Sequence, residues 1–180
     1  MSEAVLQAER IRAGLPVRRI GKEVIVLPET TSTNDLALQA SDSPANDGLA
    51  VFAEYQTAGR GRMGRSWHSP RGASILCSVL LFLDDNEAWT ARVTLIGGLA
   101  ACEAISQATA LEPMLRWPND LLIRGRKVGG VLVETRPGRA GKRACVVGIG
   151  INCLQQRAHF PQPLQDRATS LAVSYTHLRA

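Results

Sequence analysis

Residues 59–65 read GRGRMGR, and this stretch decides between two folds. It satisfies the pattern Gly-x-Gly-x-x-Gly, which in a dinucleotide-binding domain opens a helix between two parallel strands. Only ten residues separate Gly64 from the next strand-like run at Ile75, and they include Pro70 and Gly72. A parallel crossover needs about a dozen residues or more, with a helix inside. We therefore expect a loop at this point and not a dinucleotide-binding fold.

The segments around this loop alternate between strand-like and helix-like patterns. Strands are expected at 22–27, 48–56, 75–83, 114–123, 127–135 and 144–152, with turns at 118–120, 124–125 and 137–141. The continuously apolar run at 75–83 is typical of a strand covered on both faces. Helices are expected over about eight residues after an N-cap at Ser32 or Thr33, and over 88–109. This order predicts an α+β domain with a mixed β-sheet flanked by helices.

Composition indicates a globular protein inside the cell. The 180 residues are 45% hydrophobic and 21% charged, which is enough apolar sequence for one buried core. The first residues, MSEAVLQAER, lack the apolar stretch of a signal peptide, and no apolar run approaches the roughly 20 residues of a membrane span. The four cysteines form no C-x-x-C pair, so we expect reduced thiols. A cytoplasmic protein with no membrane partner is expected.

Positive charge is concentrated around the glycine-rich loop. The net charge is +5, and residues 55–83 contain four arginines but no Asp or Glu. Such a cationic site attracts a nucleotide phosphate, a nucleic-acid backbone or an acidic partner. Arginine interleaved with glycine near Trp67 keeps a nucleic-acid site open, as it does a solvated basic loop. We favour a loop whose glycines let the backbone approach a ligand while its arginines neutralise an anion.

Three further stretches place polar residues where a core strand would otherwise continue. They are TSTND at 31–35, RWPNDLLIRGRKVGGVLVE at 116–134 and VVGIGIN at 146–152. Each alone has a plain alternative: Asn152 can end a strand, Asn119 and Asp120 can form a turn, and Lys127 can be a solvated hairpin lysine. Taken in this order with EYQTAGRGRMGRSW at 54–67, they form a specific pattern.

This pattern resembles the biotin protein ligases, from about residue 24 to residue 171. The resemblance implies a core fold like that of class II aminoacyl-tRNA synthetases. It also implies a reaction in which biotin and magnesium ATP give biotinyl-5′-adenylate, from which biotin passes to a lysine of a biotin carboxyl carrier domain. Lipoate ligases share the fold but lack the arginine-glycine loop. The alternatives are ligation of lipoate or another acyl acid, and a non-catalytic module that binds biotin or nucleic acid.

The resemblance also assigns roles to residues by position. The catalytic group it implies is Arg60, Arg62 and Lys127. The biotin-binding group is Ser32, Thr33, Asn34, Gln56, Gly59, Arg60, Gly61, Arg62, Lys127, Gly130 and Gly148. The ATP or adenylate group is Arg62, Arg65, Trp67, Asn119, Asp120, Lys127 and Asn152.

The chemistry of these residue types is consistent with that assignment. Neutral Ser, Thr and Gln side chains complement the ureido ring of biotin, which has one carbonyl acceptor and two N–H donors. Cationic side chains offset the repulsion between the biotin carboxylate and the ATP α-phosphate. The histidines His68, His159 and His177 lack metal-ligand spacing, so no protein-held metal is expected, and magnesium is expected with ATP.

The sequence departs from the family pattern in the loop and at its ends. Met63 stands where many members carry another arginine. The residues before Val24 are too few for the winged helix-turn-helix of some members, so DNA binding is not expected; a homodimer remains possible. We expect residues 1–22 to be a short lead-in, 23–172 a C-terminally truncated catalytic domain without the small β-barrel domain, and 173–180 a non-native tail.

Overall fold

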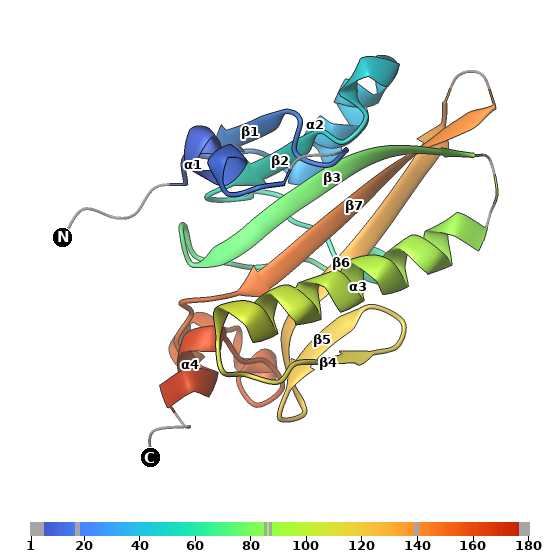
Figure 1. Ribbon diagram of the computed structural model, residues 1–180. Coiled ribbons are helices and arrows are strands. Elements are labelled where there is room, and N and C mark those ends of the chain that lie inside the picture. Colours follow the sequence, from blue (N-terminus) through green and yellow to red (C-terminus); the bar gives the residue numbers. More distant parts are fainter. Residues whose placement is uncertain (1–5, 17–18, 85, 87, 139–140, 177–180) are drawn as a thin grey trace.

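The protein is built on one mixed sheet of seven strands. The computed structural model describes residues 6–16, 19–84, 86, 88–138 and 141–176. The strand order is β1-β2-β3-β7-β6-β5-β4 (Figure 1). β1 and β2 are parallel, and every other neighbouring pair is antiparallel. The strands are β1 Val24–Leu27, β2 Ala50–Ala53, β3 Ser74–Asp84, β4 Met114–Arg116, β5 Asp120–Ile123, β6 Arg126–Pro137 and β7 Lys142–Asn152. The predicted mixed sheet is confirmed.

The glycine-rich segment joins two antiparallel strands. β2 and β3 pair in antiparallel register, with Ala50 opposite Val79. Between them the chain contains a single short 3₁₀ turn, Arg62–Gly64. No parallel crossover is present here, so the fold is not a dinucleotide-binding domain, as predicted.

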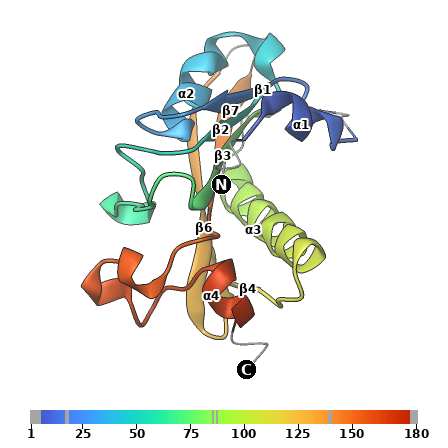
Figure 2. The same cartoon turned by 90° about the vertical axis from the view of Figure 1, so that its left-hand side faces the viewer.

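Helices cover the two faces of the sheet unequally. They are α1 Ala8–Ala13, α2 Thr33–Gln39, α3 Ala88–Ala108 and α4 Leu171–Thr176. When the sheet is seen edge-on, α2 lies on one face, and α1 and α3 lie on the other (Figure 2). α2 begins directly after Ser32, as predicted, although the Ser32 side chain makes no capping hydrogen bond.

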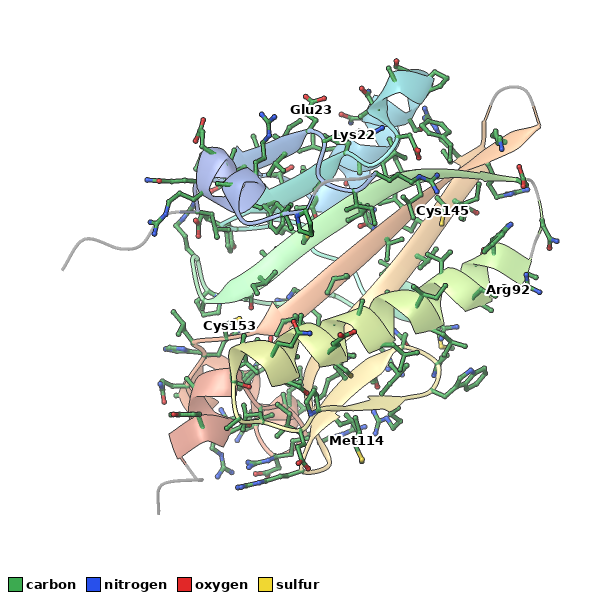
Figure 3. All side chains as sticks on the ribbon, viewed as in Figure 1. Lys22, Glu23, Arg92, Met114, Cys145 and Cys153 are labelled. Atoms are coloured by element: carbon green, nitrogen blue, oxygen red, sulfur yellow. The ribbon has the colours of Figure 1, made fainter. Side chains whose placement is uncertain are left out.

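α3 packs closely on the sheet through two glycines. A Cβ at Gly97 would lie 3.1 Å from Val147 Cγ1, and one at Gly98 would lie 2.7 Å from Leu115 Cδ1. These glycines therefore let the helix approach the sheet more closely than a residue with a side chain would allow. The predicted helix over 88–109 is confirmed, and its Val93 packs in one cluster with Val131, Cys145 and Val147 of the sheet. Cys145 is labelled in Figure 3. All four cysteines are free.

Two expectations need correction, and two segments lie partly outside the described residues. The turn expected at 118–120 within the strand-like segment 114–123 lies at 117–119, so this segment is a hairpin of β4 and β5, and Asp120, expected in the turn, already begins β5. β3 is fully buried only on the α2 side; the other side is partly covered, and Ile75 at its start is 38% exposed. Residues 139–140 of the expected turn, and 177–180 of the expected tail, are outside the described part of the chain.

Candidate active site

A row of small residues on β7 forms the floor of the site. Gly148, Gly150 and Asn152 alternate along the strand, so they face the same side of the sheet. A side chain at Gly148 would overlap the carboxamide of Asn34, and a Cβ at Gly150 would lie 2.8 Å from the Trp67 ring. Asn34 and Trp67 therefore lie directly on the strand. Gly150 was not among the predicted residues, although its alternation with Gly148 in VGIGIN was a usable signal.

The N-terminus of α2 is tied to the sheet by neutral hydrogen bonds. The backbone N–H and the hydroxyl of Thr33 both donate to Gln56 Oε1, at 2.7 and 3.0 Å. Ser78 Oγ on β3 lies 2.7 Å from Thr33 Oγ1 and 2.6 Å from Asn34 Oδ1. Ser78 is fully buried and was missed by the sequence reading. Its only signal was a hydroxyl inside an apolar run.

Arg60 is paired with two carboxylates that the sequence reading did not select. Its guanidinium donates to both oxygens of Asp35, at 3.0 and 2.6 Å, and lies 3.0 Å from Glu134 Oε2. Glu134 also accepts a 2.6 Å hydrogen bond from Asn34 Nδ2. The hydrogen bond from Arg60 holds the pKa of Asp35 below its ordinary value, and the same bond raises the pKa of Arg60.

Lys127 lies at the start of β6, between a carboxylate and an aromatic ring. Its Nζ is 2.5 Å from Asp120 Oδ1 and 6.0 Å from the centroid of the Trp67 ring. Asp120 also pairs with Arg116, at 2.6 Å. Burial alone would raise the pKa of Asp120, but the hydrogen bonds from Lys127 and Arg116 outweigh it and lower that pKa. A side chain at Gly130 would meet Lys127 Cε at 3.4 Å, so the predicted Gly130 lies beside this lysine.

The outer part of the loop carries two further exposed cations, Arg62 and Arg65. Arg62 Nη1 makes a long contact of 3.5 Å with Asn119 Oδ1, and Asn119 Nδ2 donates to the Val131 carbonyl at 2.9 Å. Arg62 and Arg65 are exposed. Met63, at the tip, is 89% exposed and has a positive φ of 58°. The loop therefore presents Arg62 and Arg65 to solvent.

Asn152 belongs to a buried polar group that is linked to Lys127 through the backbone of Thr169. Its Nδ2 donates to the Thr169 carbonyl at 3.0 Å, and its Oδ1 accepts from Gln155 Nε2 at 3.0 Å. Asn152 and Gln155 are 4% and 1% exposed. Both side-chain groups of Asn152 are thus already hydrogen-bonded, and Thr169, whose carbonyl accepts from Asn152, donates its own backbone N–H to the Lys127 carbonyl at 2.8 Å.

A cavity of about 500 Å³ borders the loop. It is lined by segments 55–59, 66–70 and 158–161. Of the predicted site residues only Gln56, Gly59 and Trp67 line it, so most of the predicted site lies outside this cavity. The indole Nε1 of Trp67 is buried, and none of the described residues accepts a hydrogen bond from it.

The two described histidines, His68 and His159, line the cavity, and neither belongs to a described metal-binding cluster. His68 is exposed and lines the cavity, and His159 Nδ1 accepts from the backbone N–H of Gln156. His177 lies outside the described residues. Within the described ranges, no group of three or more His, Cys, Asp or Glu side chains is arranged to hold a metal ion. Among the same residues, no helix is both long enough and apolar enough to cross a membrane.

Comparison with known proteins identifies the family to which this chain and its fold belong. The model of the biotin/lipoate A/B protein ligase family matches residues 26–152. The chain belongs to this family.

Two bacterial proteins are among the relatives of this chain. The chain is 38% identical over 167 residues to the bifunctional ligase/repressor BirA of Bacillus subtilis, a match that covers 93% of this chain and 51% of the relative. It is 36% identical over 177 residues to the biotin–[acetyl-CoA-carboxylase] ligase of Mycobacterium tuberculosis, covering 95% and 61%. The chain thus spans about half to three fifths of the length of these relatives.

Solved structures give the same fold. The biotin protein ligase of Aquifex aeolicus in complex with biotin and ATP superposes with a TM-score of 0.69 at 34% identity, covering 86% of this chain and 62% of that one. The Leishmania major enzyme in complex with biotinyl-5-AMP gives a TM-score of 0.70 at 27% identity, covering 88% and 66%. The predicted α+β catalytic fold is therefore confirmed.

Proposed function

We propose that this chain carries the site for ATP-dependent ligation of biotin to a lysine of a biotin carboxyl carrier domain, through biotinyl-5′-adenylate. One observation carries the proposal. A neutral hydrogen-bonding group around Thr33, Gln56 and Asn34 lies on the same sheet face as the cationic group of Lys127 and Arg62. Asn34 and Trp67 lie on alternate glycines of β7, and Lys127 lies over the Trp67 ring. The membership of the chain in the biotin/lipoate ligase family supports it, as do relatives solved with biotin, ATP and biotinyl-5-AMP.

The neutral group suits the ureido ring of biotin. The buried side chains Ser32, Thr33, Asn34 and Ser78, together with Gln56, offer donors and acceptors with no net charge. A buried site built of hydrogen-bonding groups rejects ligands that leave those groups unpaired. The hydrogen bonds of Thr33 and Asn34 to Gln56 and Ser78 fix the orientation of the motif before a ligand arrives, which reduces the ordering cost of binding.

The cationic group suits the two anions that must meet. The biotin carboxylate attacks the α-phosphorus of ATP, the bond to the β-phosphate oxygen breaks, and pyrophosphate leaves. Lys127 and Arg62 would offset the charge that develops at the α-phosphate. Magnesium would enter with the ATP phosphates. Asp120 holds the Lys127 ammonium in place, so positioning and electrostatics suffice without an enzyme nucleophile.

The second step needs an acceptor amine. The lysine of the carrier domain attacks the acyl carbon of the adenylate, AMP leaves, and an amide forms. The cavity of about 500 Å³ beside Trp67 supplies room for part of the adenylate next to the loop. The identity of the acceptor as a carboxylase carrier domain rests on the names of the relatives.

Several finer assignments belong to the same proposal. The roles assigned to single residues, the boundaries at 22 and 172, a cytoplasmic location, a possible homodimer and the absence of DNA binding are predictions from the sequence. The position of Thr33 and Asn34 at the start of α2 supports the biotin assignment. The burial of Asn152 among Thr169 and Gln155 gives the proposed adenine-side role less direct support.

Mass spectrometry tests the whole reaction. The chain is incubated with magnesium ATP, a biotin carboxyl carrier domain, and either biotin or lipoate. We expect the carrier to gain the mass of one biotin, and no lipoyl adduct at equal concentration. A lipoyl adduct alone would favour the alternative function, ligation of lipoate. Tight biotin binding without AMP production would indicate a non-catalytic binding module.

A further inference from the structure

The loop that carries GRGRMGR is a small hairpin. Its base is closed by a hydrogen bond from the backbone N–H of Trp67 to the Gly59 carbonyl, at 2.9 Å. Closer to the tip, the backbone N–H of Gly61 donates to the Arg65 carbonyl at 2.6 Å. Arg60 and Ser66 form an isolated antiparallel bridge between these two bonds. The hairpin 59–67 therefore has Arg60 in its base and Arg62 and Arg65 near its tip.

We infer that Arg60 is a positioning residue, which anchors the hairpin 59–67 to α2 and β6 through Asp35 and Glu134, and that Arg62 and Lys127 supply the charge that meets the substrate anions. The statement about Arg62 and Lys127 rests on the proposed function, whereas the statement about Arg60 does not. It changes the role that the sequence pattern suggests for Arg60, which is that of a catalytic cation.

The charge balance around Arg60 supports this role. One guanidinium faces the carboxylates of Asp35 and Glu134, so the group carries a net negative charge. A carboxylate or phosphate brought to Arg60 would have to displace these partners and would then meet two like charges. Arg62, by contrast, contacts only the neutral amide of Asn119 among the described hydrogen bonds.

The geometry at Arg60 is that of an anchor. Its two contacts to Asp35 are bidentate, an arrangement that fixes direction as well as distance. Glu134 reaches from β6 to Arg60 and to Asn34 Nδ2 at the same time. A shift of the hairpin base is therefore transmitted to Asn34, one of the residues of the proposed biotin site.

Trypsin provides a test that does not depend on ligase activity. Cleavage requires the arginine side chain to enter the protease. All three arginines are exposed, so the expected difference comes from pairing: Arg60, held by Asp35 and Glu134, is protected, while Arg62 and Arg65 are cut. We expect single-hit digestion of the ligand-free chain to release fragments that end at residues 62 and 65 and few that end at 60. In the double variant Asp35→Asn, Glu134→Gln, cleavage after Arg60 rises about tenfold relative to cleavage after Arg62.

The matched control is Asp84→Asn, which removes an aspartate paired with Lys142 at 2.6 Å, far from the hairpin. It should leave the ratio of the two cuts unchanged. If the double variant is poorly folded by circular dichroism, the single variant Asp35→Asn is used, with a smaller rise expected. An unchanged ratio in a folded variant overturns the inference.

Kinetics separate positioning from charge stabilisation. In biotin-dependent exchange of pyrophosphate into ATP, Arg60→Gln should raise the KM for biotin about tenfold with kcat within about threefold of wild type. Arg62→Gln should lower kcat about tenfold or more. A fall in kcat for Arg60→Gln equal to that for Arg62→Gln, at unchanged KM, would overturn the inference. Absence of exchange in the wild-type chain would count against the proposed function, and the digestion pattern would still decide the anchoring role.

Discussion

The carboxamide of Asn34 occupies the space that a side chain at Gly148 would need. Asn34 Oδ1 lies 2.6 Å from Ser78 Oγ, and Asn34 Nδ2 lies 2.6 Å from Glu134 Oε2, so the amide has no free direction in which to move. The glycine on β7 and the asparagine on α2 therefore depend on each other, although they are far apart in the sequence.

Gly148→Ala should displace Asn34 and disturb the proposed biotin site. Overpacking of this kind costs about 1–3 kcal/mol of stability. We expect the Kd for biotin to rise roughly tenfold or more, since about 1.4 kcal/mol corresponds to a factor of ten. Calorimetric titration with biotin, alongside thermal unfolding, measures both effects.

The control for this substitution is Gly14→Ala. Gly14 has a negative φ of −86°, and a Cβ there would make only ordinary contacts of 3.7 Å and longer. Its Tm and its affinity for biotin should match those of wild type. Equal biotin affinity in Gly148→Ala and Gly14→Ala would show that Asn34 does not contribute to the site as placed.

Asp120→Asn should slow adenylate formation by releasing Lys127. The carboxylate holds the ammonium at 2.5 Å, whereas a neutral amide attracts it weakly. We expect kcat for pyrophosphate exchange to fall about tenfold, while affinity for biotin alone changes less than about threefold. Asp84→Asn removes a similar aspartate–lysine pair at the far end of β3 and should leave both quantities unchanged. Equal kcat in the two variants would contradict the positioning of Lys127 by Asp120.

Ser78→Ala should destabilise the protein because it removes the hydroxyl that donates to the side-chain oxygen of Asn34. Ser78 is fully buried, and its loss leaves Asn34 Oδ1 without its described donor. An unsatisfied buried group costs about 1–3 kcal/mol, so denaturant unfolding should show a loss in this range. Ser106→Ala, on the exposed side of α3, should change stability by less than about 0.5 kcal/mol. A Ser78→Ala variant as stable as the Ser106→Ala control would argue against this network.

The Asp35–Arg60 pair should give a small pH dependence of stability. Because the pKa of Asp35 is lower in the folded state, its contribution is fully present above the ordinary aspartate pKa of about 3.9. It is lost as the pH falls through the lower, folded-state pKa. The side chains are about one third exposed, so the contribution is on the order of 1 kcal/mol or less. The Tm difference between wild type and Asp35→Asn should be constant from about pH 5 to 8 and should shrink as the pH falls below about 4. A difference that grows as the pH falls below about 4 would contradict it.

The fold followed from local features of the sequence. The short spacing after Gly64, with Pro70 and Gly72 inside it, was enough to exclude a crossover helix, and the length of the run 88–109 was enough to predict α3. The turn expected at 118–120 lies one residue earlier, at 117–119, because Asp120 already pairs with Arg116 and Gly130 as the first residue of β5. Turn boundaries depend on which neighbouring strand the chain pairs with, and local sequence does not specify that.

The site was less predictable because its partners are distant in sequence. Charge counting identified the arginines of the loop but not that Arg60 is neutralised by Asp35 and Glu134, which lie 25 and 74 residues away. In the sequence, nothing distinguishes Ser78 from any other small residue of a core strand. Its hydrogen bond to Thr33 of α2 is visible only in the folded structure. Pairing across a sheet is set by register, so such contacts appear only in three dimensions.

Biotin-dependent exchange of labelled pyrophosphate into ATP tests the central claim most directly, because it reports adenylate formation without any acceptor. The wild-type chain should catalyse exchange only when biotin is present, and Lys127→Ala should reduce it at least about a hundredfold while remaining folded. Lys22→Ala, on the exposed residue labelled in Figure 3, is the control and should exchange at the wild-type rate. Full exchange by folded Lys127→Ala would contradict the account of the site, and no biotin-dependent exchange by the wild-type chain would contradict the proposed function.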